Sequence, residues 1–291
     1  MHDFDDWTFH RQSRDAIVSE RLTSSPRVTS IFAFCGNSGF FDFANGGSLT
    51  DRLEAHWEAL DDAKNEEEEE EEEEERGKQR IDDTKDERIL DQRTKLSLAH
   101  DIAAALADLH DADGMRNAHG DIISASMVHA DLTTDQFIQI DGQWKLNDFN
   151  RCKFMRRHRN TGIDGEDGKP CGFLFGINPG KSRSPEEYNY QEETEKVDVY
   201  SLGNVFYTIL TDEIPFDDVS SQQAMKDIKS GIRAKIPPRF LTSEDPVDIA
   251  LRTMVEQTWR QEPAHRPRAR ELANYLAKEL EKIAKPNFMT N

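Results

Sequence analysis

The stretch VHADLTTDQFIQIDGQWKLNDFN, residues 128–150, constrains the fold of this chain more than any other part of it. Residues 137–140 alternate between apolar and polar side chains, as a half-buried strand does, and the following Asp141-Gly142 pair is typical of a two-residue hairpin turn. An apolar return strand comes next. Because a hairpin folds the chain back on itself, Asp131 and Asp148, on either side of it, are expected to lie near one opening.

Two carboxylates at one opening suit a site that handles a metal-bound phosphate. One carboxylate can accept a proton from an attacking hydroxyl group, while the other holds Mg²⁺, which prefers carboxylate oxygens together with substrate phosphate. The alternative is a β-hairpin with two solvated aspartates, because carboxylates with perturbed properties are a minority. The order of the neighbouring residues favours the first interpretation.

That order resembles the catalytic loop and metal-binding turn of eukaryotic-type protein kinases. His129-Ala130-Asp131-Leu132 is followed by a polar residue five positions after Asp131, by the hairpin and by Asp148-Phe149. The resemblance implies that Asp131 is the catalytic base and that Gln136 and Asp148 bind Mg²⁺. His129 and Phe149 are then structural members of the two motifs.

The same stretch departs from the kinase pattern at four positions. Ala130, Thr133, Gln136 and Asn150 stand where Arg, Lys, Asn and Gly are usual. With Ala130, the chain lacks the basic side chain that commonly pairs with an activation-loop phosphate. With Thr133, it lacks a positive charge beside the transferring phosphate. Two functions therefore stay open. One is transfer of the ATP γ-phosphate to a protein hydroxyl, of Ser or Thr rather than Tyr. The other is a catalytically impaired pseudokinase that acts as a binding or scaffold module in signalling.

A second series of features precedes the hairpin. Residues 9–22 have the apolar spacing of a helix, residues 28–34 and 40–44 are predicted strands joined by a glycine turn, and residues 49–60 are a further predicted helix. This order resembles the kinase small lobe from its single helix to the hinge. The resemblance implies ATP contacts by Phe41 as gatekeeper, by the backbone from Asp42 to Ala44, and by Ile138.

The helix acid that pairs with a strand lysine in kinases best matches Asp15, with Glu20 as the alternative. A solvated helix face is the plainer interpretation of both. Residues 1–8 contain neither Gly nor Lys, so they supply neither the glycine-rich loop nor the strand lysine of a kinase. We expect either that the chain is a fragment of a longer protein or that it is a kinase-like protein that has lost the segment that binds the ATP phosphates.

The second half of the chain resembles the kinase large lobe. Residues 94–110 form the clearest amphipathic helix, with Thr94 as the predicted N-cap. Ser184-Pro185-Glu186 resembles the Ala-Pro-Glu motif that closes the activation segment, and Asp198 matches the aspartate that braces the catalytic loop. Arg266 matches the partner of Glu186, so we expect a buried ion pair. Ser182, Ser184 and Thr161 are candidate phosphate acceptors beside a basic cluster at residues 151–159, although an unregulated, solvated loop is the favoured interpretation of any one of them.

These features together predict an α+β, protein kinase-like fold, with a truncated small lobe of one helix and a few antiparallel strands, and a mostly helical large lobe. The predicted boundaries are a partial small lobe and hinge at 1–48, a linking helix at 49–60, an acidic, disordered insertion at 61–92, a large lobe at 93–285 and a tail at 286–291.

Charge and cysteine content limit the partners. The net charge of −20 argues against nucleic acid or an anionic membrane as the main partner, although ten adjacent glutamates at 66–75 contribute much of that charge. Three scattered cysteines and the absence of an apolar run of membrane-spanning length predict a cytoplasmic protein, with a membrane reached only through an upstream segment. The expected partners are ATP and a protein substrate or signalling partner.

Overall fold

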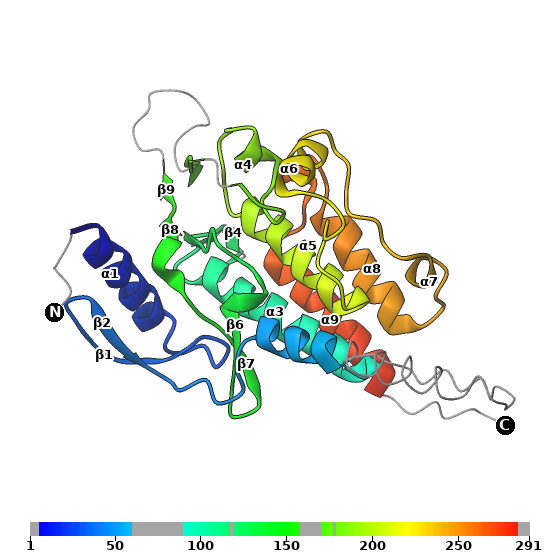
Figure 1. The fold of residues 1–291 in the computed structure, drawn as a ribbon. Coiled ribbons are helices and arrows are strands. Elements are labelled where there is room, and N and C mark those ends of the chain that lie inside the picture. The colour runs from blue at the N-terminus through cyan, green and yellow to red at the C-terminus, as the bar shows by residue number, and fades with distance from the viewer. Residues whose placement is uncertain are drawn as a thin grey trace, which may run out of the picture.

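A computed structural model of the chain describes residues 6–59, 90–116, 119–120, 122–157, 170–176 and 179–284. The predicted tail and all but the last three residues of the predicted acidic insertion lie outside this part, as does Thr161. The described chain forms a smaller part on one side and a larger, mostly helical part on the other, with a β-hairpin between them (Figure 1). This arrangement agrees with the predicted α+β fold.

The smaller part consists of one helix and one hairpin. Helix α1 (Asp6–Arg21) begins three residues before the predicted start, and it buries Ala16 and Val18 while Glu20 stays exposed. Strands β1 (Ile31–Cys35) and β2 (Ser38–Phe41) pair antiparallel around a turn at Gly36, whose φ of +60° favours glycine. The second strand ends earlier than predicted, because its partner β1 starts at Ile31, opposite Phe41.

The central hairpin joins this part to the rest. Strands β6 (Phe137–Ile140) and β7 (Gln143–Leu146) form the predicted pair, and Asp141 and Gly142 both have positive φ, as a type I′ turn requires. Val28, predicted to lie within a strand, instead forms a parallel bridge with Leu146, and Ser48 bridges Ile138. The smaller part is therefore attached to both strands of the hairpin.

Helix α3 (Gln92–Asp111) is the centre of the larger part. The predicted apolar stripe is buried along its whole length, with every member at 0% exposure: Leu96, Ala99, Ile102, Ala103, Leu106 and Leu109. The N-cap is Asp91 and not Thr94, because the Asp91 carboxylate accepts the Thr94 backbone N–H at 3.0 Å. Thr94 is the third residue of the helix, which is where the N-cap's hydrogen-bond donor lies.

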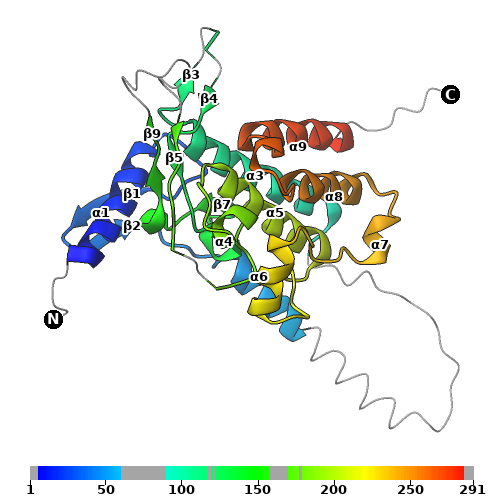
Figure 2. The same ribbon diagram turned by 90° about the horizontal axis from the view of Figure 1, so that it is seen from above.

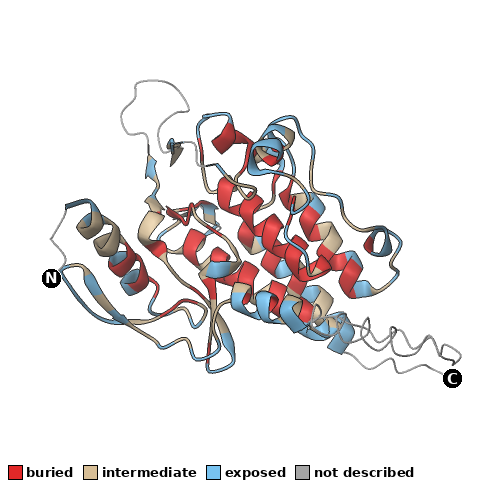
Figure 3. Ribbon diagram, viewed as in Figure 1, coloured by how far each residue is buried: buried red, intermediate tan, exposed pale blue. Residues whose placement is uncertain are grey.

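Helices α5 (Lys196–Thr211), α8 (Pro246–Thr258) and α9 (Ala269–Ala284) pack with α3 into one core (Figures 1 and 2). Buried residues concentrate on α3, α5 and α8, whereas α1 is buried only in its second half and α9 on the side that faces α3 (Figure 3). At Gly203 of α5, a Cβ atom would lie 2.3 Å from the Thr258 hydroxyl of α8, so this close helix contact requires glycine.

Short elements complete the described chain. A helix at residues 49–59 follows the hinge, in agreement with prediction. The remaining elements are β3 (Met115–Arg116), β4 (Ile122–Ser124), β5 (Met127–Val128), η1 (Thr134–Gln136), η2 (Phe149–Arg151), β8 (Lys153–Phe154), β9 (Arg156–Arg157), β10 (Pro170–Cys171), α4 (Pro185–Tyr188), α6 (Ser221–Lys229), α7 (Pro238–Leu241) and η3 (Pro263–His265). Among the described helices, none has the length and apolar character needed to cross a bilayer.

Candidate active site

A buried aspartate fixes the loop that carries Asp131. The Asp198 carboxylate, on α5, accepts the backbone N–H groups of His129 and Ala130, both at 2.7 Å, and it contacts His110 Nε2 at 2.9 Å. Ala130 has φ of +63°, a left-handed conformation that costs free energy in a residue with a side chain. Because Asp198 holds both amides, it stabilises this strained turn and thereby positions the next residue, Asp131.

Asp131 is half-buried and faces two guanidinium groups. Arg183 donates from Nη2 to Asp131 Oδ1 and from Nη1 to the Ala130 carbonyl, the latter at 3.1 Å, while Arg151 Nη1 lies 3.5 Å from the same Oδ1. Among the described residues, no hydrogen bond reaches Asp131 Oδ2. Oδ1 therefore accepts the hydrogen bond that orients the carboxylate.

Asp148 lies at the end of the hairpin in a left-handed conformation, with φ of 59°. Its Oδ1 accepts the backbone N–H of Asn150 at 3.4 Å and also the Asn150 side-chain amide. Asn150 in turn accepts a hydrogen bond from Arg11 Nη2 at 2.6 Å, and its carbonyl accepts one from Arg14 Nη1 at 3.2 Å. The residue that replaces glycine thus links the carboxylate to α1.

The segments that carry Asp131, Gln136 and Asp148 are hydrogen-bonded to one another. Asn147, directly before Asp148, donates its N–H to the Gln136 carbonyl at 2.9 Å, and its own carbonyl contacts His129 Nε2 at 3.0 Å. A carboxylate and an amide oxygen are ligands that suit Mg²⁺ when phosphate oxygens and water complete its shell. Asp148 and Gln136 carry these two ligand types, and among the described residues no group of three or more His, Cys, Asp or Glu side chains could hold a metal ion.

Phe149, the residue after Asp148, contacts helix α1. Phe149 is fully buried, its ring lies 5.5 Å from the His129 ring, and its N–H donates to Asp15 Oδ1 at 2.7 Å. Of the two acids considered from the sequence, Asp15 is buried against the site and Glu20 is exposed. Burial raises the pKa of Asp15 to about 6; the Phe149 N–H opposes this rise and the Asp148 charge adds to it.

The segment after β2 has the backbone groups expected of a hinge. Asp42 donates its N–H to the Ser30 carbonyl at 3.2 Å, and its side chain accepts from Lys145 Nζ at 3.1 Å. Within the described chain, the Asp42 carbonyl and the Ala44 N–H have no partner. An acceptor and a donor two residues apart match the edge of an adenine base. Phe41 and Ile138, half-buried beside this segment, are the nearby apolar candidates.

The predicted ion pair between Glu186 and Arg266 is present and buried. Arg266 Nη1 lies 2.6 Å from Glu186 Oε1, and Nη2 lies 2.8 Å from Oε2. The other guanidinium donors reach the carbonyls of Lys196, Gln261 and Arg260. All five N–H groups of Arg266 therefore have acceptors, as a buried guanidinium requires.

Comparison with known proteins agrees with this geometry. The family model described as protein tyrosine and serine/threonine kinase matches residues 14–276, well over half of the chain. The chain belongs to the protein kinase family.

Individual kinases resemble this chain at low identity. The dual specificity protein kinase pyk3 of Dictyostelium discoideum is 30% identical over 170 residues, 58% of this chain and 11% of the relative. The serine/threonine-protein kinase mos of Xenopus laevis is 27% identical over 173 residues, 58% of this chain and 45% of the relative. Serine/threonine-protein kinase 12 of Arabidopsis thaliana is 24% identical over 184 residues, 63% of this chain and 35% of the relative. The matched region is thus less than half the length of each of these relatives.

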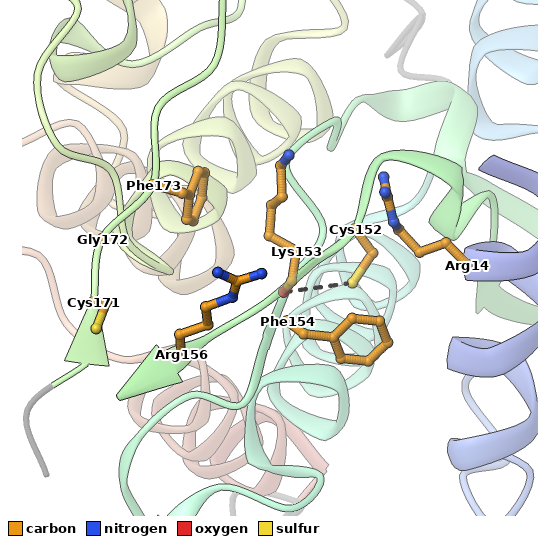
Figure 4. A pocket seen from close by; sticks show the side chains of 8 residues that line it. All are labelled: Arg14, Cys152, Lys153, Phe154, Arg156, Cys171, Gly172 and Phe173. Carbon is orange, nitrogen blue, oxygen red and sulfur yellow. Dashed lines mark hydrogen bonds between the residues drawn. The ribbon is translucent and has the colours of Figure 1, made fainter. Parts of the chain in front are cut away.

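In this kinase domain the candidate phosphate acceptors differ in access. Ser184 is 0% exposed and its hydroxyl caps α4 by accepting the Glu187 N–H, so we correct its assignment as an acceptor. Ser182 is half-buried. Part of the predicted basic cluster lines a pocket of about 380 Å³, in which Arg14, Lys153 and Arg156 gather (Figure 4). Burial lowers the pKa of Lys153, and the neighbouring arginines lower it further.

The contacts that sequence reasoning missed are those of the arginines. Arg183 lies 52 residues from Asp131 in the chain, and Arg11 lies 139 residues from Asn150. An arginine in a polar segment has no sequence pattern that specifies its partner, because its long side chain reaches many positions. Only a resemblance that included these arginines would have identified them.

The raised pKa of Asp15 gives this kinase domain a testable pH dependence. Between about pH 4 and pH 6 the folded state binds more protons than the unfolded state, so the contribution of Asp15 to stability falls as pH rises through this window. Asp15→Asn keeps an acceptor for Phe149 and removes the buried charge. We expect the variant to exceed the wild type in free energy of unfolding near pH 7 by on the order of 2–3 kcal/mol, and to match it near pH 4.

Urea unfolding of both proteins at several pH values measures this difference. Glu20→Gln, the same change at the exposed position of α1, is the control and should shift stability little at any pH. A variant that is less stable than the wild type near pH 7 would show that the Asp15 charge is stabilising, contrary to this account.

Proposed function

We propose that this kinase domain transfers the γ-phosphate of ATP to a protein hydroxyl, with Asp131 as the catalytic base. The observation that supports this most directly is the arrangement of the Asp131 carboxylate. Asp198 braces the loop, Arg183 and Arg151 contact Oδ1, and Oδ2 accepts no hydrogen bond within the described chain. A base positioned in this way can accept the hydroxyl proton as the oxygen attacks phosphorus.

The other residues of the site fit supporting roles. Mg²⁺, held by Asp148 and Gln136, would neutralise the charge of the phosphate groups. The Asp42 carbonyl and the Ala44 N–H would bind the adenine edge, between Phe41 and Ile138. Arg183 places a guanidinium beside Asp131, where Thr133 supplies no charge, so it can stabilise negative charge near the acceptor hydroxyl.

A serine or threonine acceptor is the proposed preference. Mos and serine/threonine-protein kinase 12 are named for these acceptors, whereas pyk3 is named as a dual specificity kinase. The experiment that tests the function therefore compares Ser, Thr and Tyr as acceptor residues.

The second candidate function is that of a pseudokinase that binds signalling partners without phosphate transfer. One observation favours it: Asn150 donates two hydrogen bonds to Asp148 Oδ1, an atom that a magnesium ligand set would use. Mg²⁺ would then be held through Asp148 Oδ2, or through Oδ1 after the Asn150 side chain has rotated away. A domain that cannot make this change would bind nucleotide weakly or without metal.

A phosphorylation assay separates the two functions. The protein, in the form that the cell makes, is incubated with Mg·ATP and three degenerate peptide pools that offer Ser, Thr or Tyr as the acceptor. We expect phosphate incorporation into the Ser and Thr pools. No incorporation into any pool, or into the protein itself, at saturating Mg·ATP would reject transferase activity and support the pseudokinase.

A further inference from the structure

Arg183 lies between two carboxylates, and only one of them belongs to the site described above. Its Nη2 group donates to Asp131 Oδ1 and its Nη1 group to the Ala130 carbonyl, while its Nε atom lies 3.7 Å from Glu187 Oε1. The side chains of Arg183 and Glu187 are only 12% and 5% exposed. One buried guanidinium therefore connects the catalytic base to a carboxylate of helix α4.

The backbone around Arg183 is fixed by hydrogen bonds. Ser184 caps α4 by accepting the Glu187 N–H, and the Arg183 N–H donates to the Tyr188 hydroxyl at 3.4 Å. That hydroxyl in turn donates to the Gly180 carbonyl at 2.6 Å. Because the backbone is held in this way, the position of the guanidinium depends mainly on its two carboxylate neighbours.

Glu187 lacks a contact that buried carboxylates usually have. Its Oε1 atom is buried and accepts no hydrogen bond within the described chain, so Arg183 at 3.7 Å is an ionic contact only. Buried polar atoms are generally hydrogen-bonded, and burial of a charge is costly. A glutamate in this place is therefore poorly explained by packing, and its effect on Arg183 is the alternative.

Four charged groups act on Glu187, and they come from different segments. Burial raises the pKa of Glu187 to about 7; the charges of Arg183 and Arg151 oppose this rise, and those of Glu193 and Asp131 add to it. Burial also raises the pKa of Glu193 to about 7, so the change in charge near neutral pH belongs to this pair of glutamates. Arg183 stays charged, because burial lowers its pKa while Glu187 and Asp131 raise it by more.

The other ionisable groups around α4 keep their charge in this pH range or have their own partners. Burial raises the pKa of Tyr188 to about 12, so its hydroxyl is neutral near pH 7. Glu186 is paired with Arg266. Helix α6 packs against α4, but none of its charged residues forms an ion pair or hydrogen bond with Glu187 in the described chain.

We propose that Glu187 is a positioning residue for phosphate transfer, which acts on the catalytic base Asp131 through Arg183; this role rests on the proposed function. When Glu187 is ionised, it shares the positive charge of Arg183 with Asp131. When Glu187 is neutral, that charge acts on Asp131 alone. The guanidinium then holds the Asp131 carboxylate more firmly and favours its ionised form, which makes it a weaker acceptor of the hydroxyl proton.

Single-turnover phosphate transfer at several pH values tests this role. We expect the wild-type rate to fall as the pH decreases through about 7, because Glu187 takes up a proton. Glu187→Gln is neutral at every pH, so it should transfer phosphate about three- to tenfold more slowly than the wild type near pH 8 and equally fast near pH 6. Glu187→Asp keeps the charge on a shorter side chain and should recover part of the rate near pH 8.

The matched control is Glu192→Gln, the same change at an exposed position of the same segment. Glu192 Oε1 accepts the Gly172 N–H at 2.8 Å, and a glutamine oxygen can accept it equally. This variant should keep the wild-type rate and pH profile. Thermal unfolding shows whether each variant is folded.

Two further variants separate an effect through Arg183 from a structural one. In an Arg183→Met protein the guanidinium is absent, so the addition of Glu187→Gln should not change the rate further. Glu193→Gln removes a charge that raises the pKa of Glu187, so it should move the fall in rate to lower pH. Loss of packing at Glu187 would produce neither result.

Two outcomes would overturn the role of Glu187 and leave the proposed function intact. One is a Glu187→Gln protein whose rate and pH profile equal those of the wild type. The other is an equal loss of rate from Glu187→Gln with and without Arg183. No transfer by the folded wild type at any pH would instead reject the proposed function and, with it, the role of Glu187.

Discussion

Alanine in place of Arg266 is expected to lower the free energy of unfolding by about 3–5 kcal/mol. The substitution leaves the Glu186 carboxylate buried without its cation, and it removes the guanidinium from the carbonyls of Lys196, Gln261 and Arg260. Domains are typically stable by only about 5–15 kcal/mol, so this loss is a large fraction of the total. Chemical denaturation followed by tryptophan fluorescence measures it.

The control is an ion pair of the same shortest N–O distance in solvent. Lys282 Nζ lies 2.6 Å from Glu279 Oε1, the same distance as in the Arg266 pair, but the Lys282 side chain is 68% exposed. Lys282→Ala should change the free energy of unfolding much less than Arg266→Ala, because water screens an exposed pair. The double variant Glu186→Gln with Arg266→Met should be more stable than Arg266→Ala, because no buried charge remains unpaired. Equal losses for the buried and exposed pairs would show that burial does not set the cost.

Asparagine in place of Asp131 is expected to reduce the rate of phosphate transfer by about 10²–10⁴-fold. The change keeps an oxygen that can accept from Arg183 and removes the group that takes the proton. The affinity for ATP should change little, because the hinge and Asp148 are untouched. Single-turnover phosphorylation and an ATP-binding titration measure the two quantities separately.

Asp135→Asn supplies the matched control within the same loop. Asp135 is exposed, and it accepts a weak hydrogen bond from Thr133 Oγ1 at 3.4 Å, so its replacement should leave the rate unchanged. Thermal unfolding of Asp131→Asn shows whether the variant keeps its fold despite the altered contact with Arg183. A folded Asp131→Asn protein that transfers phosphate at the wild-type rate would remove Asp131 from the role of base.

The elements that the sequence predicted well are those with short-range causes. The hairpin was predictable because Asp141-Gly142 accepts the positive φ of a tight turn, and the stripe of α3 because it recurs with the helical period. The ends of elements were less predictable. The N-cap of α3 was predicted at Thr94 and lies at Asp91. Both residues have side chains that can cap a helix, so the N-cap is decided only by where the first helical turn begins.

Contacts between distant residues were predictable only where a known motif order supplied the pairing. The Glu186–Arg266 pair is of this kind, since neither residue has a local pattern that specifies the other. Arg183 and Asn150 show the limit: their contacts with Asp131 and Asp148 depend on side-chain placement after the loops have been fixed.

The sequence by itself determined the family, the order of the elements and the identity of the two candidate carboxylates, because these follow from local periodicity, turn chemistry and motif order. Tertiary structure alone decided which cations face Asp131, which hydrogen bonds Asp148 accepts and that Ser184 is buried. The physical reason is the separation along the chain over which each kind of interaction acts. Backbone preferences act over a few residues, whereas burial and ion pairing depend on which distant segments the packed core brings together.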